Sequence, residues 1–541
     1  MKTKSNAFFS SKFINSARVR GFLLAGAAWL AGASLPAVAQ TFTTGDLLVS
    51  RSVYSGNAST VTIGQALPGG GNATANGSYP NVFQNESQDA SFGVTSPIYL
   101  DEISTSGGAP VMTMNVTGVL AGDGINLSTS FPSKSEIALN LSQDGSAVTF
   151  MGYIAAPNTL DVSNSNTPGH VDATNPVALT YQRAVAQLNA DGTLEVTPVD
   201  TYSGNNGRAA VLAGGNYYMV GNAGNGSGIE PTNIVNNTGL QMIAPGSLTG
   251  NATVVGKESG TEGAKNGNQF GYTVTQNGFA ADKSGKDNNL RGLTVFNNTL
   301  YVSKGSGSNG INTVYQVGTS GTLPTPGTAA NTTISVLPGF PTTLASNTTA
   351  TQAHPFGLWF ANADTLYVAD EGDGVLADAG NRTVDPDAGL QKWSYNGTTW
   401  NLDYILTNGL NLGAQYSVGN GSDGEVYPTA LDPATDGLRN ITGEINGNGT
   451  VTIYAITSTV STQTDEGADP NLLVGITDTL ADTNIAQASG EDFSTLEAAT
   501  YGEVLRGVSF TPTAVPEPEA YALILGVLGG AAAWWSRRSK N

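Results

Sequence analysis

Short apolar runs separated by turn residues fill the chain between residues 40 and 516. Each run holds about four to eight β-prone residues bounded by Gly, Asn, Asp or Ser. Almost none of them places apolar residues at the spacing of about 3.6 residues that marks a helix. The pattern therefore predicts an all-β body.

A two-strand unit recurs along this body, made of an apolar strand, a tight turn and a second apolar strand. Its clearest copies pair residues 290–296 with 299–303 and residues 355–360 with 365–370. Weaker copies pair 137–141 with 147–150, 209–212 with 217–220, and 441–445 with 451–454, and the runs 390–395 and 400–406 supply third and fourth strands. Repeated units of about four strands are typical of the blades of a β-propeller.

One unit is divided between the two ends of the body. Residues 505–510 repeat the first strand of the unit, and residues 45–50 repeat the second. A closed propeller joins its ring in this way, because closure removes unpaired strand edges. We therefore predict a β-propeller, most readily with six blades and with seven left open, and with long insertions at 64–96 and 257–290.

Two rival folds explain the pattern less well. A β-helix repeats about every 20–30 residues, a period that the sequence does not show. A string of β-sandwiches gives no reason for a unit completed by both termini.

The N-terminal segment, residues 1–39, has the pattern of a signal peptide. A basic start precedes an apolar run from Gly21 to Leu35, and Ala37-Val38-Ala39 forms a small-x-small cleavage site for signal peptidase. The alternative is an N-terminal membrane anchor. The signal-peptide interpretation predicts export of the chain.

The C-terminal segment begins with Val515-Pro516-Glu517-Pro518, continues through the uncharged run 520–535, and ends with Arg537, Arg538 and Lys540. A helix over that run would be about 24 Å long, slightly short of a hydrocarbon core of about 30 Å. We expect a single transmembrane helix with its basic tail on the cytoplasmic side.

This segment, residues 515–541, resembles the PEP-CTERM sorting signal, which combines a Val-Pro-Glu-Pro motif, a transmembrane stretch and an arginine cluster. The resemblance implies a Gram-negative bacterium that makes exopolysaccharide, and an exosortase that recognises Pro516-Glu517-Pro518 and removes the tail. The alternative is an ordinary C-terminal anchor after a Pro-rich linker. The body, residues 40–514, resembles uncharacterised secreted propellers that carry such a tail. Both resemblances imply a place at the cell surface or in the extracellular matrix, and neither implies an activity.

Composition excludes several classes of protein and site. The chain carries 22 Lys and Arg against 42 Asp and Glu, a net charge of -20, which argues against nucleic-acid binding. It has no Cys, so disulfides, thiolate chemistry and Cys-type metal sites are excluded. With only two His, neither a His-rich metal site nor a Ser-His-Asp triad is indicated.

Four acidic residues lie at the end of the second strand of one unit and shortly after it: Asp370, Glu371, Asp373 and Asp378. Calcium binds about six to eight oxygen ligands, often from flexible loops. The spacing differs from an EF-hand, because Gly372 stands where a ligand should be. Two interpretations stay open, a calcium site and a solvated turn that caps the strand.

A second candidate site joins three cationic residues. Aligning the repeats on their glycines places Arg291 and Arg506 opposite Phe356, two residues after His354 and on the same strand face. First strands of propeller blades line the central channel, so His354, Arg291 and Arg506 are candidates for a cationic ring that binds a uronate or phosphate. The alternative is hydrogen bonding between blades.

The segment Gly305 to Gly310 fits the G-x-G-x-x-G pattern of dinucleotide sites. Such a site requires a helix directly afterwards, whereas residues 311–317 have the pattern of a strand. We interpret the segment as a propeller loop.

These observations favour a noncatalytic binding or structural protein, exported, sorted by exosortase and associated with exopolysaccharide. The alternative is a calcium-dependent hydrolase or lyase that acts on a phosphoester or an acidic sugar. No catalytic residue is assigned, because propellers support both kinds of function.

Overall fold

The structure is a computed structural model that describes residues 42–54, 56, 61–80, 93–224, 234, 237–256, 287–347, 351–376, 383–462 and 466–514. The chain divides into two units, Met1–Ala39 and Gln40–Asn541. All described residues belong to the second unit, and the following account concerns them alone.

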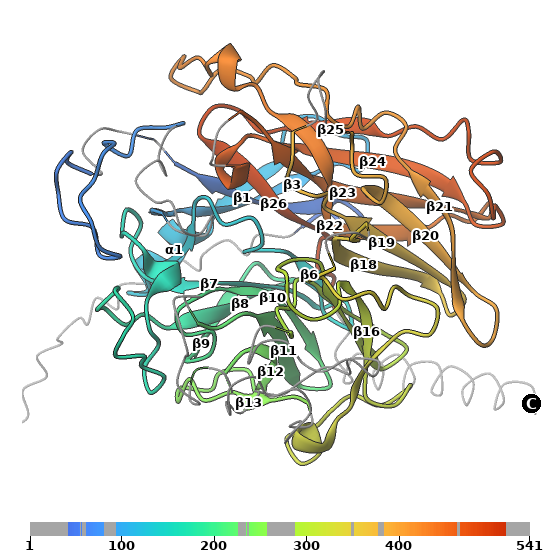
Figure 1. Ribbon diagram of the computed structural model, residues 1–541, viewed down its shortest axis with the longest axis horizontal. Helices are drawn as coiled ribbons and strands as arrows, with labels where there is room; N and C mark the ends of the chain where they lie inside the picture. The colour runs from blue at the N-terminus through green and yellow to red at the C-terminus, as the bar shows by residue number, and fades with distance from the viewer. Residues whose placement is uncertain are drawn as a thin grey trace, which may run out of the picture. The chain divides into compact units, whose positions relative to one another are not determined.

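The described part of the chain contains six antiparallel sheets, each of which is one blade (Figure 1). The first blade contains β26 (Glu503–Phe510), β1 (Leu47–Val53), β3 (Ile98–Ile103) and β4 (Met112–Asn115). The second contains β6 (Asn140–Leu141), β7 (Ala147–Ile154), β8 (Arg183–Asn189) and β9 (Leu194–Val199), with β5 (Leu127–Ser130) paired to β7 and β2 (Thr95–Ser96) paired to β5. The third contains β10 (Gly207–Ala213), β11 (Asn216–Gly221), β12 (Gly239–Ile243) and β13 (Thr253–Val254).

The other three blades follow the same meander. The fourth contains β14 (Leu293–Phe296), β15 (Thr299–Lys304), β16 (Thr313–Val317) and β17 (Ile334–Val336). The fifth contains β18 (Pro355–Asn362), β19 (Thr365–Asp370), β20 (Gly389–Tyr395) and β21 (Trp400–Leu406), and the sixth contains β22 (Ala434–Ile445), β23 (Thr450–Val460), β24 (Leu472–Thr479) and β25 (Ser494–Ala498). The connections hold the short helix α1 (Val116–Gly122) and the 3-10 turns Val162–Asn164, Ala329–Asn331, Thr429–Leu431 and Glu466–Ala468.

The innermost strands contact one another in a closed circle. β10 contacts β6 and β14, β18 contacts β14 and β22, and β26 contacts β22 and β6. Each of the six blades is thus joined to a neighbour on both sides. The predicted all-β propeller with six blades is confirmed for the part of the chain that the structure describes.

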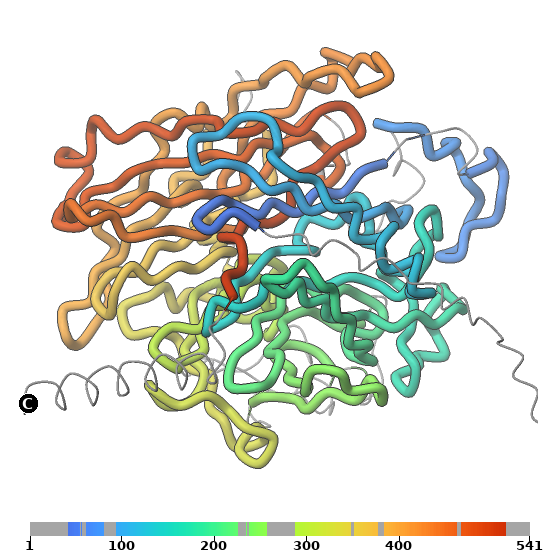
Figure 2. Tube along the Cα trace, turned by 180° about the vertical axis from the view of Figure 1, so that it is seen from behind, coloured from blue at the N-terminus to red at the C-terminus, as the bar shows by residue number. Residues whose placement is uncertain are grey.

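The two ends of the body complete one blade, as the divided repeat predicts. β1 pairs antiparallel with β26, with Leu47 opposite Phe510 and Val53 opposite Glu503. In Figure 2 the N-terminal strand, in blue, lies beside the C-terminal strand, in red. Because β1 also pairs with β3, both edges of β1 are paired, and β26 forms the innermost strand of the blade.

Close approach of the innermost strands explains their glycines. A Cβ atom on Gly292 would lie 2.1 Å from the carbonyl oxygen of Phe356, and one on Gly357 would lie 2.4 Å from that of Arg439. Such distances leave no room for a side chain. The axis between these strands holds a cavity of about 10 Å³, enough for about one water molecule.

Hydroxyl groups on the second strands connect neighbouring blades. The Oγ of Ser50 donates to the carbonyl oxygen of Ile137 at 2.6 Å, and the Oγ1 of Thr149 donates to that of Ala210 at 2.7 Å. The first bond reaches the turn before β6 of the next blade, and the second reaches β10 of the next blade. Apolar clusters fill the rest of these interfaces, one joining the third and fourth blades and another joining the fifth and sixth.

Some sequence predictions concern residues outside the description. The signal peptide, residues 1–39, and the sorting segment, residues 515–541, both lie there, and so does the expected helix over 520–535. Of the two expected insertions, residues 64–80 and 93–96 of the first and 287–290 of the second are described. Among the described residues no helix has the length and apolar character needed to cross a membrane.

Candidate functional site

Two adjoining pockets open where the innermost strands begin. The first, the arginine pocket, encloses about 220 Å³ and is lined by His354, Glu371, Asp373, Asp436, Arg439 and Thr459 together with glycines 305, 307, 372 and 374. The second, the amide pocket, encloses about 210 Å³ and is lined by Ser133, Ser135, Asn205, Asn206, Arg208, Asn222 and Asn289. Lys134, Arg291 and Ser306 line both pockets, so the two share one wall.

An arginine stands at the same position in four of the six blades. Each of these residues precedes the small residue at which the strand approaches the axis: Arg208 before Ala209, Arg291 before Gly292, Arg439 before Asn440 and Arg506 before Gly507. The sequence alignment found Arg291 and Arg506 because it was anchored on glycine. It missed Arg208 and Arg439, where Ala or Asn replaces that glycine, although the shared Arg was a usable signal.

Arg439 lines the arginine pocket. Its side chain lies on β22, the residue is 4% exposed, and its Nε donates to Oε2 of Glu371 at 3.1 Å. Among the described residues, Nη1 and Nη2 of Arg439 have no hydrogen-bond partner, and neither atom is sealed from solvent. A buried guanidinium with a free planar edge is suited to bind a carboxylate or phosphate through two hydrogen bonds.

The ionisation of Glu371 reports the positive potential of this pocket. Burial by itself would raise the pKa of Glu371, but Arg291, Arg439, Lys134 and His354 together lower that pKa to about 2. Oε1 of Glu371 lies 3.8 Å from Nη2 of Arg291. An anionic ligand group in the same space would be stabilised by the same cations.

The pKa of Asp436, which also lines the pocket, is shifted in the opposite direction. Burial, with the charges of Asp373 and Glu371, raises the pKa of Asp436 to about 7. Its Oδ2 accepts a hydrogen bond from the backbone nitrogen of Gly374 at 2.9 Å. Near neutral pH this side chain is therefore both a hydrogen-bond donor and an acceptor.

The structure brings together two of the three predicted cationic residues. Arg291 and His354 both line the arginine pocket, and Nδ1 of His354 donates to the carbonyl oxygen of Gly305 at 3.1 Å. Arg506 lines neither of the two pockets. It is buried, and its Nη2 donates to the carbonyl oxygens of Phe131 and Gly467, which joins the blade-closing strand β26 to two loops.

The predicted calcium ligands have separate surroundings where they are described. Asp370 is fully buried and accepts hydrogen bonds from the backbone nitrogens of His354, at 2.7 Å, and Gly372, at 3.1 Å. Glu371 faces the arginines instead, and Asp373 accepts from the backbone nitrogen of Val375 at 2.9 Å. Asp378 lies outside the described residues, among which no three acidic or histidine side chains are grouped to hold a metal ion.

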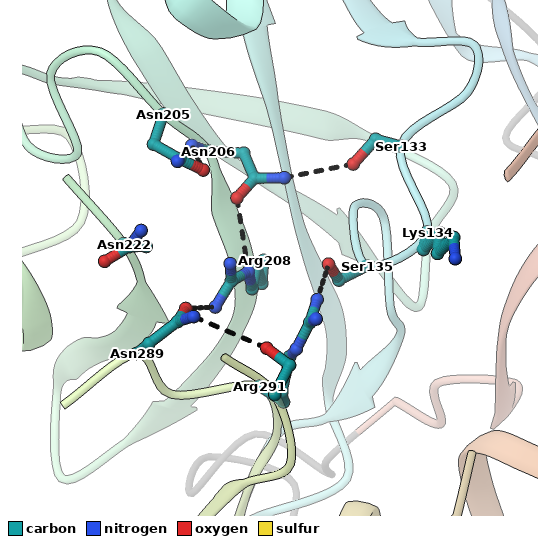
Figure 3. Close-up of a pocket in the computed structure, with 10 residues that line it drawn as sticks. Ser133, Lys134, Ser135, Asn205, Asn206, Arg208, Asn222, Asn289 and Arg291 are labelled. Carbon is teal, nitrogen blue, oxygen red and sulfur yellow. Dashed lines mark hydrogen bonds between the residues drawn. The ribbon is translucent and has the colours of Figure 1, made fainter. Parts of the chain in front are cut away.

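Amide side chains surround Arg208 in the second pocket (Figure 3). Nε of Arg208 donates to Oδ1 of Asn206 at 3.2 Å, and its Nη1 donates to Oδ1 of Asn289 and to the carbonyl oxygen of Leu290. Asn206 and Asn289 each stand two residues before an arginine of the repeat, Asn206 directly before β10 and Asn289 in the segment before β14. The sequence analysis missed these amides because loops of three blades bring them together.

The G-x-G-x-x-G segment is a loop between two strands. Residues 305–310 connect β15 to β16, as the sequence predicts, and Gly305, Ser306 and Gly307 line the arginine pocket. A Cβ atom on Gly305 would lie 2.4 Å from the carbonyl oxygen of Pro355. The glycine therefore allows this loop to lie against the neighbouring blade.

Comparison with known proteins shows no relative in sequence. No family model matches the chain, and no curated protein matches it. Among solved structures, the N-terminal domain of Nup159 is similar at 8% identity and a TM-score of 0.28, over 87% of this chain and 98% of that one. The hemagglutinin-neuraminidase ectodomain of parainfluenza virus 5 is similar at 12% identity and a TM-score of 0.29, over 79% of this chain and 78% of that one. Likenesses this distant carry no argument about function.

Proposed function

We propose that the chain is an exported β-propeller that binds an acidic polysaccharide, with the carboxylate of one uronate-type sugar held in the arginine pocket. One observation carries the proposal. Arg439 is almost fully buried, yet among the described residues its Nη1 and Nη2 have no hydrogen-bond partner. A guanidinium edge that is open to the pocket and has no protein partner is completed by water or by a ligand.

The charge balance of the pocket favours a carboxylate over a phosphate. Lys134, Arg291 and Arg439 are opposed by Glu371, Asp373 and Asp436. Because acidic and basic residues are nearly matched, a group with a single negative charge fits better than one with two. The carboxylates, Ser306 and Thr459 also supply acceptors and donors for the hydroxyl groups of a sugar.

The rest of the proposal concerns the route and place of the protein. A signal peptide over residues 1–39 would direct export, and exosortase would recognise Pro516-Glu517-Pro518 and remove the tail. The propeller would then meet exopolysaccharide at the cell surface or in the matrix. The two pockets provide the surface on which such a polymer would be bound.

Asp436 favours a second candidate function. A carboxyl group with a pKa of about 7 beside a carboxylate-binding arginine is placed as a general acid or base. A hydrolase or lyase acting on the bound uronate would use Asp436 in that role. Cleavage of an oligouronide by the purified protein, and its loss in Asp436→Asn, would favour this function over simple binding.

The binding proposal is tested by calorimetric titration of the purified protein with glucuronate and oligouronides. Arg439→Met should weaken binding by about 10- to 100-fold, because truncating one partner of a buried charged pair costs about 2 kcal/mol or more. Arg439→Lys keeps the charge but loses the planar fork, so it should restore only part of the affinity.

Asn401→Asp is the matched control, because it lowers the net charge by the same amount at an exposed position of the outer strand β21. It should leave the affinity unchanged. Equal affinity in Arg439→Met and the parent protein would overturn the proposal. Equal losses in Arg439→Met and Asn401→Asp would also overturn it, because they would show that only net charge matters.

A further inference from the structure

The amide pocket differs from the arginine pocket in its charge. Lys134, Arg208 and Arg291 line it, and no Asp or Glu is among its described lining residues. The arginine pocket, in contrast, has three carboxylates of its own. The amide pocket is therefore the more positive of the two, in a chain whose net charge is -20.

Asn222 offers this pocket an uncommitted donor. The residue is 5% exposed, and its Oδ1 accepts from Oγ1 of Thr238 at 3.4 Å. Among the described residues its Nδ2 has no hydrogen-bond partner, and this atom is not sealed from solvent. In Figure 3 no dashed line joins Asn222 to the other side chains drawn.

The neighbouring amides are already engaged and hold the arginine in place. Nδ2 of Asn206 donates to Oγ of Ser133 at 3.1 Å, while its Oδ1 accepts from Arg208. Arg291 donates through Nη1 to Oγ of Ser135 at 2.7 Å. These bonds fix the cations from two sides, so the positive charge is preorganised before any ligand arrives.

We infer that the amide pocket is a second subsite, which binds the acidic group of the sugar unit next to the one in the arginine pocket. Resting on the proposed function, the inference narrows the ligand to a polyuronide with at least two consecutive acidic units. The shared wall of Lys134, Arg291 and Ser306 allows one ligand to occupy both pockets. In the amide pocket, Nδ2 of Asn222 donates to the ligand, and Lys134 and Arg208 stabilise its charge.

The test compares three ligands by calorimetric titration of the purified protein: glucuronate, a disaccharide of two uronates, and a disaccharide of one uronate and one neutral sugar. The diuronate should bind at least about tenfold more tightly than either of the others, as expected for one added charge-assisted contact. Asn222→Asp, which places a negative charge in the pocket at unchanged size, should abolish that gain and leave the binding of glucuronate unchanged. Asn222→Ser, which keeps a hydrogen-bond donor, should retain most of the gain in affinity for the diuronate.

Each outcome bears on a different proposal. Equal affinity for the diuronate and the mixed disaccharide overturns the second subsite while the proposed function stands. The second subsite is also overturned if Asn222→Asp still binds the diuronate as much more tightly than glucuronate as the parent protein does. Failure of all three ligands to bind overturns the proposed function itself. An unchanged thermal unfolding midpoint in Asn222→Asp shows that the variant is folded. If that midpoint is lowered, the test uses Asn222→Ser, which should keep most of the gain in affinity for the diuronate, and Asn222→Ala, which should lose it.

Discussion

Replacing Asp478 with Asn should lower the free energy of unfolding by about 3–5 kcal/mol, the cost of leaving one charge of a buried pair without its partner. Asp478 on β24 and Lys392 on β20 are both fully buried, and Oδ2 of Asp478 lies 2.8 Å from Nζ of Lys392. The pair joins the sixth blade to the fifth. Tyr404 donates to Oδ1 of Asp478 at 2.5 Å, and Tyr367 donates to its Oδ2.

The magnitude depends on the contacts that the variant leaves to Lys392. This residue would keep two neutral acceptors, the hydroxyl oxygen of Tyr404 at 2.9 Å and the carbonyl oxygen of Thr479 at 2.7 Å. Neither acceptor carries a negative charge, so the buried ammonium group would lose most of its stabilisation. Replacing both members, as in Lys392→Met with Asp478→Asn, should cost less than Asp478→Asn alone, because no buried charge remains.

Urea unfolding followed by tryptophan fluorescence and circular dichroism measures these differences. Glu503→Gln is the matched control, since Glu503 pairs with Arg51 but its side chain is 24% exposed. A pair with that exposure should contribute about 1 kcal/mol or less. The reasoning is refuted if Asp478→Asn costs no more than Glu503→Gln, or if the double variant is less stable than Asp478→Asn.

Two other predictions concern the axis and the pH dependence of stability. Gly357→Ala should cost about 1–3 kcal/mol or more in urea unfolding, because its Cβ would lie 2.4 Å from the carbonyl oxygen of Arg439. Gly397→Ala is the control, because Gly397 has a positive φ but open space around it. Its loss of stability measures backbone strain without a steric clash. Burial raises the pKa of Asp436 and of Glu497 to about 7, so these groups stabilise the fold most at low pH, and that contribution is lost as the pH rises through 7. Glu371, with a pKa of about 2 instead of 4.5, adds stability as the pH rises from 2 to 4.5, whereas Asp436 and Glu497 lose theirs between their ordinary pKa values and 7. Thermal unfolding should therefore show its highest midpoint at about pH 4 to 4.5.

The sequence could predict the ring because local and long-range signals agree there. Residues 45–50 and 505–510 each carry half of a repeated unit, and their pairing as β1 and β26 follows from strand period and edge closure. The turn at 297–298 similarly fixes the hairpin of β14 and β15, because both asparagines adopt positive φ. Such signals lie within a few residues of the elements that they specify.

The pockets could be predicted only in part, because they depend on loops from different blades. Arg291 and His354 were found through the repeat, whereas Asn222 has no counterpart in it. Asn222 lines the amide pocket because the chain after β11 turns beside the loop that carries Ser133. That approach is set by the packing of the second blade against the third, and no pattern within either segment encodes it.

Positive charge is used sparingly in this chain, and its placement supports specific rather than general binding of anions. The described residues contain nine lysines and arginines, namely Arg51, Lys134, Arg183, Arg208, Arg291, Lys304, Lys392, Arg439 and Arg506. Those that do not line the two pockets are bonded inside the protein; Arg183, for example, donates to the carbonyl oxygens of residues 163, 165, 181 and 205. At physiological salt a charge acts over about 8 Å. Among the described residues, then, the cations open to a ligand are those of the two pockets. If the proposed function holds, a polyanion would meet these cations only where its acidic groups enter the pockets, which would favour a ligand of matching spacing.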